Sequence, residues 1–318
     1  MRVALITGVS GQDGWHLARL LLAEGTTVWG ATRDGRAPAA LPGIRPVAIA
    51  DIRDGAAIER ALAQVRPDEL YHLAALSRVD AAWADPALAG EVNGIATARL
   101  LEAMRRISPR TRLYVASSAL AFGAVERSPQ DESTPFRSDT PYGLSKAYAS
   151  EIARIYRRAH GLFVAVGIHY NHESPRRPPS FLSRKIACGA VAIARGEATA
   201  LRLGNLDAIR DWSFAGDHAQ AMILATRADE PDDFVFGSGD AHAVRDWCAR
   251  AFGRAGLDWR DHVVSDPELW RPAEAVPLVA DPTEARRRLG LEPSLGFEAL
   301  VDLMVAAERA VDAAEAGR

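Results

Sequence analysis

The sequence predicts an α/β protein: a doubly wound parallel sheet of the Rossmann type, followed by a smaller C-terminal α/β domain that holds the substrate. Two observations carry this prediction. Apolar runs alternate with helical segments of roughly 10–20 residues as far as about residue 172, as in parallel sheets covered on both faces. A glycine-rich turn follows the first run, and beyond residue 172 prolines gather in "SPRRPPS" and the segments shorten.

Each predicted strand is a short apolar run bounded by polar or turn-forming residues. In chain order the strands are expected at 2–8, 26–32, 45–51, 68–75, 111–117 and 163–169, with helices at 15–25 and 55–65 among those between them. The apolar stretch "DDFVFGSG" predicts that the chain returns to the sheet late. We therefore expect a cofactor domain of residues 1–172 and about 207–238, and a substrate domain of about 173–206 and 239–318.

Composition and charge exclude several classes of function. A formal net charge of −3 provides no basic field for nucleic acid or for an anionic membrane. The two cysteines, Cys188 and Cys248, lack zinc-ligand spacing, so we expect no metal site and two buried, inert thiols. No apolar stretch reaches the length of a membrane span, and residues 3–6 form a strand rather than a signal-peptide core, so we expect a cytoplasmic location.

The turn "TGVSGQDG" predicts a phosphate-binding loop. Gly8, Gly11 and Gly14 recur at three-residue spacing between the first strand and its helix. Glycines let the backbone turn tightly and approach a pyrophosphate, which the N-terminus of the helix then stabilises. With Gln12 and Asp13 between them, these residues are expected to bind a dinucleotide, and simple tight packing is the alternative.

The ends of the following strands bear on which dinucleotide is bound. An acidic residue at the end of the second strand would favour NAD, but Thr32 and then Arg33 stand there, and arginine suits the 2′-phosphate of NADP. We therefore expect NADP, with NAD left open. Asp51 either accepts a hydrogen bond from the adenine amino group or caps the next helix. The third and fourth strands complete the expected cofactor site with Asp51, Ile52, Leu73 and Ala74.

The motif "TPYGLSK" places Tyr142 and Lys146 four residues apart, on one face of a predicted helix. A lysine ammonium near a phenol stabilises the phenolate, whose unperturbed pKa is about 10. The phenolate can then accept a proton from a sugar hydroxyl while hydride passes to a nicotinamide, whose ribose the lysine can also hold. Ser118 is expected to hydrogen-bond the same hydroxyl, and its neighbour Ser117 to be structural. Ser118, Tyr142 and Lys146 are therefore the predicted catalytic residues, and Tyr142 and Lys146 also belong to the expected cofactor site.

Several stretches of the chain carry a resemblance to a known family. They are "LITGVSGQDG", "YHLAALSRV", "TPFRSDTPYGLSKAYA", "NHESPRR", "SRKI", "LGNLDAIRDW" and "RPAE", in this order along nearly the whole chain. With them the chain resembles the extended short-chain dehydrogenase/reductase superfamily and, within it, the GDP-mannose 4,6-dehydratase branch. The resemblance implies a Rossmann domain that binds the cofactor and a C-terminal domain that binds a nucleotide sugar, with GDP as the expected nucleotide.

The resemblance also implies roles for particular residues. Asn171, Glu173 and Arg177 would lie between the cofactor and the sugar nucleotide. Those expected on the diphosphate, or on the base and ribose beside it, are Lys185, Arg210, Arg271 and Glu274. A diphosphate suits guanidinium donors, although each arginine taken alone is equally a surface charge.

The chain departs from the dehydratase branch in the segment "SSALAFG". In that branch a glutamate, two residues after the serine or threonine, removes the C5 proton so that water can leave from C6. Leu120 stands at that position, with no adjacent carboxylate. General acid–base catalysis contributes about 10²–10⁴-fold, so its loss raises the barrier by roughly 3–5 kcal/mol. Reversible oxidation at C4 keeps its residues, whereas elimination loses its base.

We therefore expect a sugar-nucleotide 4-epimerase of the GDP type, acting on a hexose or a heptose. Arg33 favours one alternative, an NADPH-dependent 4-ketoreductase of a nucleotide-linked 4-keto sugar. Another alternative is a GDP-mannose 4,6-dehydratase whose base is displaced, with Glu126 and His169 as candidates. A catalytically silent NADP-binding regulator remains, and the retention of all three predicted catalytic residues counts against it.

Further departures bear on assembly and substrate. The segment after Arg33 is shorter than in the dehydratases, where this loop helps to build a tetramer, so we expect a homodimer. Phe122 replaces the usual tyrosine. Leu76 and Arg78 replace a polar pair, and Arg78 either faces the sugar nucleotide or lies at the exposed start of a helix.

Overall fold

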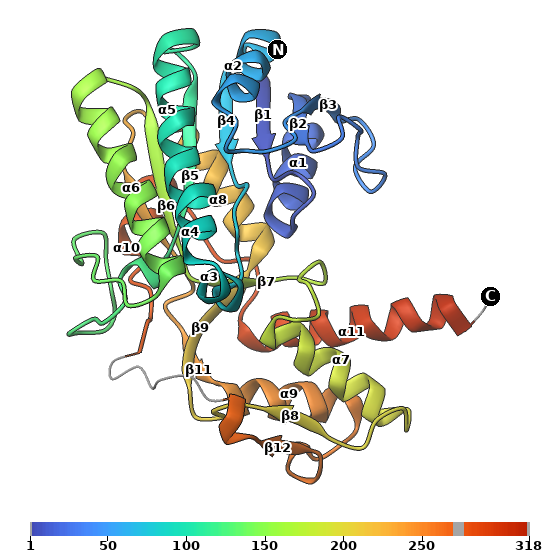
Figure 1. The fold of residues 1–318 in the computed structure, drawn as a ribbon. Coiled ribbons are helices and arrows are strands. Elements are labelled where there is room, and N and C mark those ends of the chain that lie inside the picture. The colour runs from blue at the N-terminus through green and yellow to red at the C-terminus, as the bar shows by residue number, and fades with distance from the viewer. Residues whose placement is uncertain (1, 270–276, 317–318) are drawn as a thin grey trace.

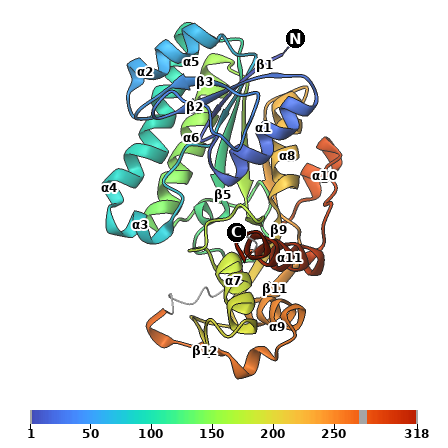
Figure 2. The same ribbon diagram turned by 90° about the vertical axis from the view of Figure 1, so that its right-hand side faces the viewer.

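The larger part of the protein is a sheet of seven parallel strands with helices on both faces, which confirms the predicted fold class. The computed structural model describes residues 2–269 and 277–316. In spatial order the strands are β10 (Asp233–Phe236), β6 (Val164–His169), β5 (Arg112–Ser118), β4 (Glu69–His72), β1 (Val3–Thr7), β2 (Thr27–Thr32) and β3 (Arg45–Ala48). The smaller part lies beyond the carboxyl ends of these strands (Figures 1 and 2).

Helices cover both faces of the large sheet. One layer consists of α2 (Gly55–Val65), α5 (Ala96–Ile107) and α6 (Pro141–His160), and the other of α1 (Gln12–Ala23) and α8 (Ala215–Arg227). Each layer closes its own apolar core against the sheet. Burial on both faces explains why the strands read as continuous apolar runs in the sequence rather than as alternating ones.

Short helices connect β4 to α5. They are α3 (Val79–Ala84), α4 (Pro86–Ala89) and η1 (Gly90–Ile95), a π-helical stretch that continues into α5. The buried Asn93 of η1 accepts a hydrogen bond from Leu76 N at 2.8 Å and donates one to Ser145 Oγ at 2.9 Å. The loop that follows β4 is therefore fixed against α6, the helix that carries the predicted tyrosine and lysine.

The smaller part contains two short sheets packed with helices around a core of its own. One sheet holds β7 (Asn171–Glu173), β9 (Ile209–Phe214) and β11 (Ala241–Ala243), and the other β8 (Leu201–Leu203) and β12 (Val263–Ser265). The helices are α7 (Leu182–Ala194), α9 (Val244–Ala255), α11 (Phe297–Ala316), η3 (Trp259–Asp261) and η4 (Pro267–Leu269). The chain returns from this part to the large sheet twice. In the first return α8 packs on the large sheet and β10 joins it, and in the second α10 (Thr283–Leu289) packs against α8 and β10.

The two cysteines differ in burial. Cys248 is fully buried, as expected, but Cys188 is only half-buried, and its thiol donates to Glu308 on the adjacent α11. Burial raises the pKa of Cys188 to about 11 and that of Cys248 to about 12, so both remain thiols at neutral pH. Within residues 2–269 and 277–316, no helix combines the length and the apolar character that crossing a bilayer requires.

Candidate functional site

The glycine-rich loop lies where β1 ends, against the end of β4. Gly8 has a φ of +73°, and a Cβ there would approach Ala74 N to 2.8 Å, so only glycine fits this turn. Gly14 would likewise collide with the backbone of Gly8. The helix α1 starts at Gln12, and Gly11 before it offers no capping side chain. The first backbone N–H groups of α1 are thus left for an anion, as a phosphate-binding loop requires.

Gln12 and Asp13, which were expected to bind the cofactor, direct their side chains to β7 and the residues that follow it. Gln12 donates to His172 O at 3.0 Å and accepts from Ser174 Oγ at 2.9 Å. Asp13 Oδ2 lies 3.1 Å from His172 Nε2. Burial raises the pKa of Asp13, but the charge and hydrogen bond of His172 outweigh it and hold that pKa well below its usual range. These two residues therefore connect the phosphate loop to the smaller sheet through hydrogen bonds.

The adenosine end of the expected cofactor site is formed by the ends of β2 and β3. Asp51 is not the cap of α2, because Asp54 accepts the hydrogen bonds from the first N–H groups of that helix. The carboxylate of Asp51 pairs with Arg53 at 2.7 Å, and this hydrogen bond lowers its pKa to about 2. The charge of Arg33 also acts on Asp51, so both lie at the same edge. At the neighbouring strand, the N–H groups of Leu73 and Ala74 donate to Thr7 Oγ1, whereas Ile52 packs against the core under α2.

The three predicted catalytic residues meet where β5 ends and α6 begins. Thr140 caps α6 and Pro141 occupies its first turn, which fixes the position of Tyr142. Burial raises the pKa of Tyr142, while a hydrogen bond to Ser118 and the charge of Arg177 lower it. Ser117, by contrast, is buried and accepts a hydrogen bond from Ser150 at 2.7 Å, as expected of a structural residue.

Lys146 lies one turn along α6 from Tyr142 and is buried. Its ammonium donates to the carbonyl of Ala116 at 2.9 Å. Burial lowers the pKa of Lys146 to about 8, and the charge of Asp13 only partly opposes this. The charge of Arg177 also lowers the pKa of Tyr142, a contribution that the sequence did not indicate.

Leu120 lies beside this group, in the short helix η2 (Ala119–Ala121). Its N–H donates to Ser118 Oγ at 3.3 Å, and its carbonyl lies directly under Gly143 in the first turn of α6. The charge of Asp13 raises the pKa of Tyr142, and this carboxylate is bound to His172. Glu126, a candidate for a displaced base, is exposed and pairs with Arg137.

The residues expected on the sugar nucleotide fall into two sets. Asn171, Glu173 and Arg177 lie together on and after β7: Glu173 is buried, accepts from Ser183 at 2.5 Å and pairs with Arg177 at 3.2 Å. In the smaller part, Lys185 donates to Arg202 O and Arg210 to Ile209 O. Arg271 and Glu274 lie outside the described residues. Separately, Arg78 stands at the exposed start of α3 and pairs with Asp80, which favours the helix-start interpretation.

Sequence reasoning missed a group of buried histidines beneath the loop. His169, His172 and His218 bring ring nitrogens within 4.8 Å of one another, a grouping that could hold a metal ion. Each ring nitrogen already has a protein partner, however, so we interpret the group as a hydrogen-bond network. The spacing of His169 and His172 was visible in the sequence, but nothing in it linked them to His218.

Comparisons with known proteins agree with this geometry. A family model described as GDP-mannose 4,6 dehydratase matches residues 5–304. The chain is 39% identical to GDP-mannose 4,6 dehydratase 2 of Arabidopsis thaliana, over 96% of this chain and 86% of that protein. It is 36% identical to GDP-mannose 4,6 dehydratase of Homo sapiens, over 96% of this chain and 91% of that protein.

Solved structures share the fold over nearly the full length. A putative epimerase from Burkholderia cenocepacia has a TM-score of 0.86 at 28% identity, covering 97% of this chain and 98% of its own. The UDP-glucose 4-epimerase of Thermus thermophilus, solved in complex with NAD, has a TM-score of 0.84 at 28% identity, covering 96% of this chain and 99% of its own.

Fold and site together define an NAD(P)-dependent enzyme of the extended short-chain dehydrogenase/reductase superfamily that modifies nucleotide sugars. Within that class, the chain belongs to the GDP-mannose 4,6-dehydratase family. The names of these sequence relatives favour the dehydratase alternative over the 4-epimerase that Leu120 led us to expect.

Proposed function

We propose that this chain binds NADP, with NAD as the alternative, and transfers hydride reversibly at C4 of a GDP-linked sugar. The residues fit a dinucleotide. A Cβ added at Gly11 would meet only Gly8 O, at 3.3 Å, so the loop is open where a pyrophosphate would approach. At the end of β2, the buried Thr32 Oγ1 has no hydrogen-bond partner among the described residues, and Arg33 follows it.

Each catalytic side chain has a defined task in this proposal. The nicotinamide, when bound, accepts a hydride and returns it. Ser118 holds the C4 hydroxyl, and Tyr142 takes its proton as the hydride leaves. The positive charges of Lys146 and Arg177 offset the negative charge that the phenolate carries during the step. The hydrogen bond of Ser118 to Tyr142, which lowers the pKa of the tyrosine, supports this assignment.

Leu120 is the observation that selects the product. The Leu120 backbone lies next to Ser118 and under the first turn of α6, and its side chain, which cannot accept a proton, packs against the apolar cluster that contains Phe122. A sugar oxidised at C4 beside it has no base to remove the C5 proton, so the hydride returns without loss of water. Return of the hydride to the other face gives the C4 epimer, and we propose a GDP-sugar 4-epimerase.

A second candidate is the 4,6-dehydratase, which the sequence relatives favour. It requires a base that the site does not obviously supply. Glu126 is exposed and paired with Arg137. His169 is buried, and both of its ring nitrogens are hydrogen-bonded to Tyr114 and His218. Neither group is free to reach a sugar in this arrangement, which supports the epimerase against the dehydratase.

Incubation with GDP-mannose and with a GDP-heptose in D₂O, followed by mass spectrometry and proton NMR, tests the proposal. An epimer keeps the mass of its substrate and gains no deuterium at C5. A dehydratase product lacks the mass of one water and carries deuterium at C5, which would replace the epimerase by the second candidate. A 4-ketoreductase would consume NADPH only when it is given a 4-keto sugar. Absence of hydride transfer with every one of these substrates would indicate a silent cofactor-binding protein.

The proposal includes a homodimer in the cytoplasm. Leu144, Tyr148 and Ile155 on α6 are 63%, 44% and 45% exposed, and the first two line a groove of about 530 Å³ next to η1. One stripe on one helix can meet a second copy of itself about a two-fold axis. The loop after β2 folds back on its own chain instead, with Leu41 buried and Ala40 O accepting from Trp15 at 3.1 Å.

Sedimentation tests the assembly. We expect the wild-type chain to sediment as a dimer and the double variant Leu144→Glu/Ile155→Glu as a folded monomer, because two carboxylates in an apolar contact lose their hydration. Arg110→Glu, a charge change on an exposed loop outside this stripe, serves as the control and is expected to stay dimeric. A stable tetramer of the wild-type chain would contradict the proposal.

A further inference from the structure

Three histidine rings lie between the phosphate loop and the smaller sheet, and two of them, His169 and His218, take no part in the proposed hydride transfer. His169 ends β6, His172 is in β7 and His218 is in the first turn of α8. All three residues are at most 9% exposed. They come from segments that meet only because the small sheet docks at the carboxyl edge of the large one.

The partners of His172 define its charge. Its Nδ1 lies 2.7 Å from Tyr170 O, and its Nε2 lies 3.1 Å from the carboxylate of Asp13. Both partners are acceptors, so both ring nitrogens must carry protons, and His172 is an imidazolium. Burial lowers the pKa of His172, but the charge and hydrogen bond of Asp13 raise it by more, so the pKa lies above its ordinary value. His172 is therefore a buried cation paired with the phosphate loop.

The other two histidines form a hydrogen-bonded chain of fixed direction. Ser213 Oγ donates to Asn171 O at 3.2 Å, so it must accept from His218 Nε2, 2.6 Å away. The remaining nitrogen of His218 then accepts from His169 Nδ1 at 2.7 Å. His169 Nε2 in turn accepts from the hydroxyl of Tyr114 at 2.7 Å. Every group is satisfied when both histidines are neutral.

The neutral chain supports the cation. The ring of His218 stacks on that of His172, with centroids 4.4 Å apart and planes 19° from parallel. A neutral ring face attracts a cation, whereas a second imidazolium there would repel it. Burial lowers the pKa of His169 to about 3, and it lowers that of His218 well below its ordinary value, so both stay neutral. The groups that face His172 and can carry charge are Asp13 and His16 on α1, Arg177 after β7, and the rings of His169 and His218.

We propose that His218 and His169 are positioning residues that hold His172 as an imidazolium, so that its pair with Asp13 couples the binding of cofactor and sugar nucleotide. This inference rests on the proposed function. The pair joins the first turn of α1, which follows the phosphate loop, to β7, and Glu173 and Arg177 of the expected sugar-nucleotide site follow directly. Ordering one side of the pair orders the other, which lowers the conformational cost of binding the second ligand.

Two variants and one matched control test the inference. His218→Phe keeps a ring to stack on His172 but breaks the hydrogen-bonded chain. Ser213→Ala removes only the last link of that chain and leaves the packing in place. Thr226→Val changes an equally buried polar side chain at the other end of the same helix, where its hydroxyl donates to Met222 O and interacts with Tyr71. The measurements are calorimetric titrations with NADPH and GDP, alone and in sequence, and ¹⁵N NMR of the histidine rings against pH.

In the wild-type chain we expect both nitrogens of His172 to be protonated at pH 7 and GDP to bind at least about fivefold more tightly once NADPH is bound. In His218→Phe, His172 should lose its proton at lower pH and NADPH should bind about tenfold more weakly, because a buried partner is lost. The factor by which bound NADPH tightens the binding of GDP should fall towards one. Ser213→Ala should change all three in the same direction by less, and Thr226→Val should change none.

Equal His172 titrations in the wild-type chain and both site variants, with unchanged coupling, would overturn the inference, and so would an equal loss in Thr226→Val. Failure of the wild-type chain to bind NADPH or NADH would count against the proposed function. The inference would then stand or fall on the titration of His172 alone, which needs no ligand.

Discussion

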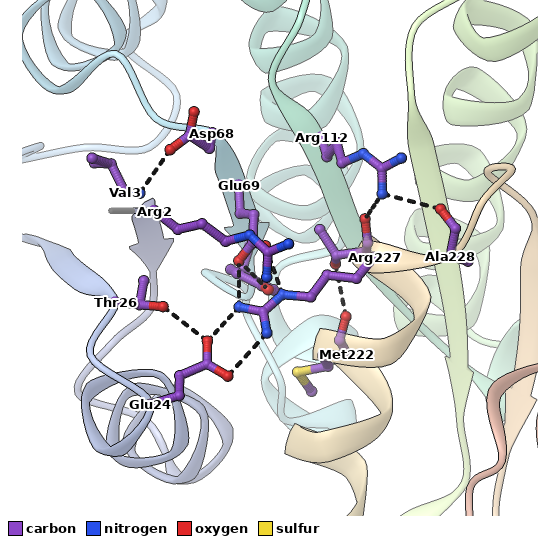
Figure 3. A network of polar contacts seen from close by, with 12 residues as sticks. Arg2, Val3, Glu24, Thr26, Asp68, Glu69, Arg112, Met222, Arg227 and Ala228 are labelled. Carbon is purple, nitrogen blue, oxygen red and sulfur yellow. Dashed lines mark hydrogen bonds and ion pairs between the residues drawn. The ribbon is translucent and has the colours of Figure 1, made fainter.

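The two ends of helix α8 reach two buried polar networks of opposite character. At its C-terminal end, Arg227 lies between Glu69, at 2.7 Å, and Glu24, at 2.9 Å (Figure 3). Tyr71 donates to the same Glu69 at 3.0 Å, and Arg2 approaches it at 3.8 Å. Arg2, Glu24, Glu69 and Arg227 each have an opposite charge within this network, which joins α8, β4 and the end of α1, whereas Arg112 beside it donates to two backbone carbonyls.

At the N-terminal end of α8 the balance is different. Asp13 neutralises His172, and Glu173 neutralises Arg177, but among the described residues the buried ammonium of Lys146 donates to the carbonyl of Ala116 and forms no ion pair. A buried charge without a counter-ion destabilises a fold unless a ligand or a reaction uses it. We therefore call the network around Arg227 the closed network and the one around Lys146 the open network. The closed network stabilises the fold, whereas the open network is arranged for an anionic ligand and a proton transfer.

Tyr142→Phe should give the largest effect, and on function alone. The variant lacks the hydroxyl that takes the proton, so turnover of the sugar nucleotide should fall by about 10²–10⁴-fold. Its NADPH affinity and its unfolding midpoint in urea should match those of the wild-type chain. A loss of stability as large as that expected for Glu69→Ala would show that the open network also stabilises the fold, and the two networks would then not differ in function.

Glu69→Ala should give the opposite pattern. Glu69 is 2% exposed, and its removal leaves Arg227 with Glu24 as its remaining carboxylate partner. Breaking a buried pair of this kind costs about 3–5 kcal/mol, measured by urea unfolding, and the partial compensation by Glu24 places the expected value near about 3. The NADPH affinity of the folded variant should not change. A weakened cofactor affinity would mean that the two ends of α8 are coupled.

The dependence on pH sharpens the same contrast through Lys146. Burial lowers its pKa to about 8, below the value of 10.5 expected when the chain is unfolded. The charged form therefore destabilises the fold below pH 8, and this penalty disappears as the pH rises towards 10.5. Catalysis needs the charged form, so kcat/KM should fall about tenfold for each pH unit above that pKa. Activity and the Lys146 contribution to stability should thus change in opposite directions.

Lys146→Met provides the control for that profile. The variant should lose the alkaline fall in kcat/KM together with most of its activity. It should also gain stability at pH 7, because an apolar side chain of similar length replaces a buried charge. An alkaline fall that persists in this variant would assign the titration to another group.

Much of the architecture follows from local patterns in the sequence. The alternation of apolar runs with helices predicted the parallel sheet, because strands buried on both faces read as continuous apolar runs that short windows detect. The loop glycines and the Tyr142–Lys146 spacing are also local, and the structure brings Ser118 to the same tyrosine. Such features need only neighbouring residues, or the rule that parallel strands end at one edge of their sheet.

The parts that escaped prediction depend on long-range docking. The direction of the Asp13 carboxylate towards His172 spans 159 residues of sequence. The link from His169 to His218 spans 49, and the hydrogen bond from the ammonium of Lys146 to a carbonyl on β5 spans 30. No periodicity reports which buried polar groups will meet across two sheets, because many partners satisfy the same hydrogen-bonding requirement.

Leu120→Glu should have the smallest effect, and it tests the chemistry of the open network most directly. The new carboxylate would replace a side chain that cannot accept a proton, on the residue whose backbone N–H donates to Ser118 Oγ. Burial opposes its ionisation, so we expect only slow water loss from GDP-mannose, detected as deuterium at C5, with 4-epimerisation still dominant. Leu120→Gln has the same shape without the basicity and should show no deuterium uptake. If the wild-type chain already dehydrates the sugar as fast as Leu120→Glu does, a residue other than the one at position 120 supplies the base.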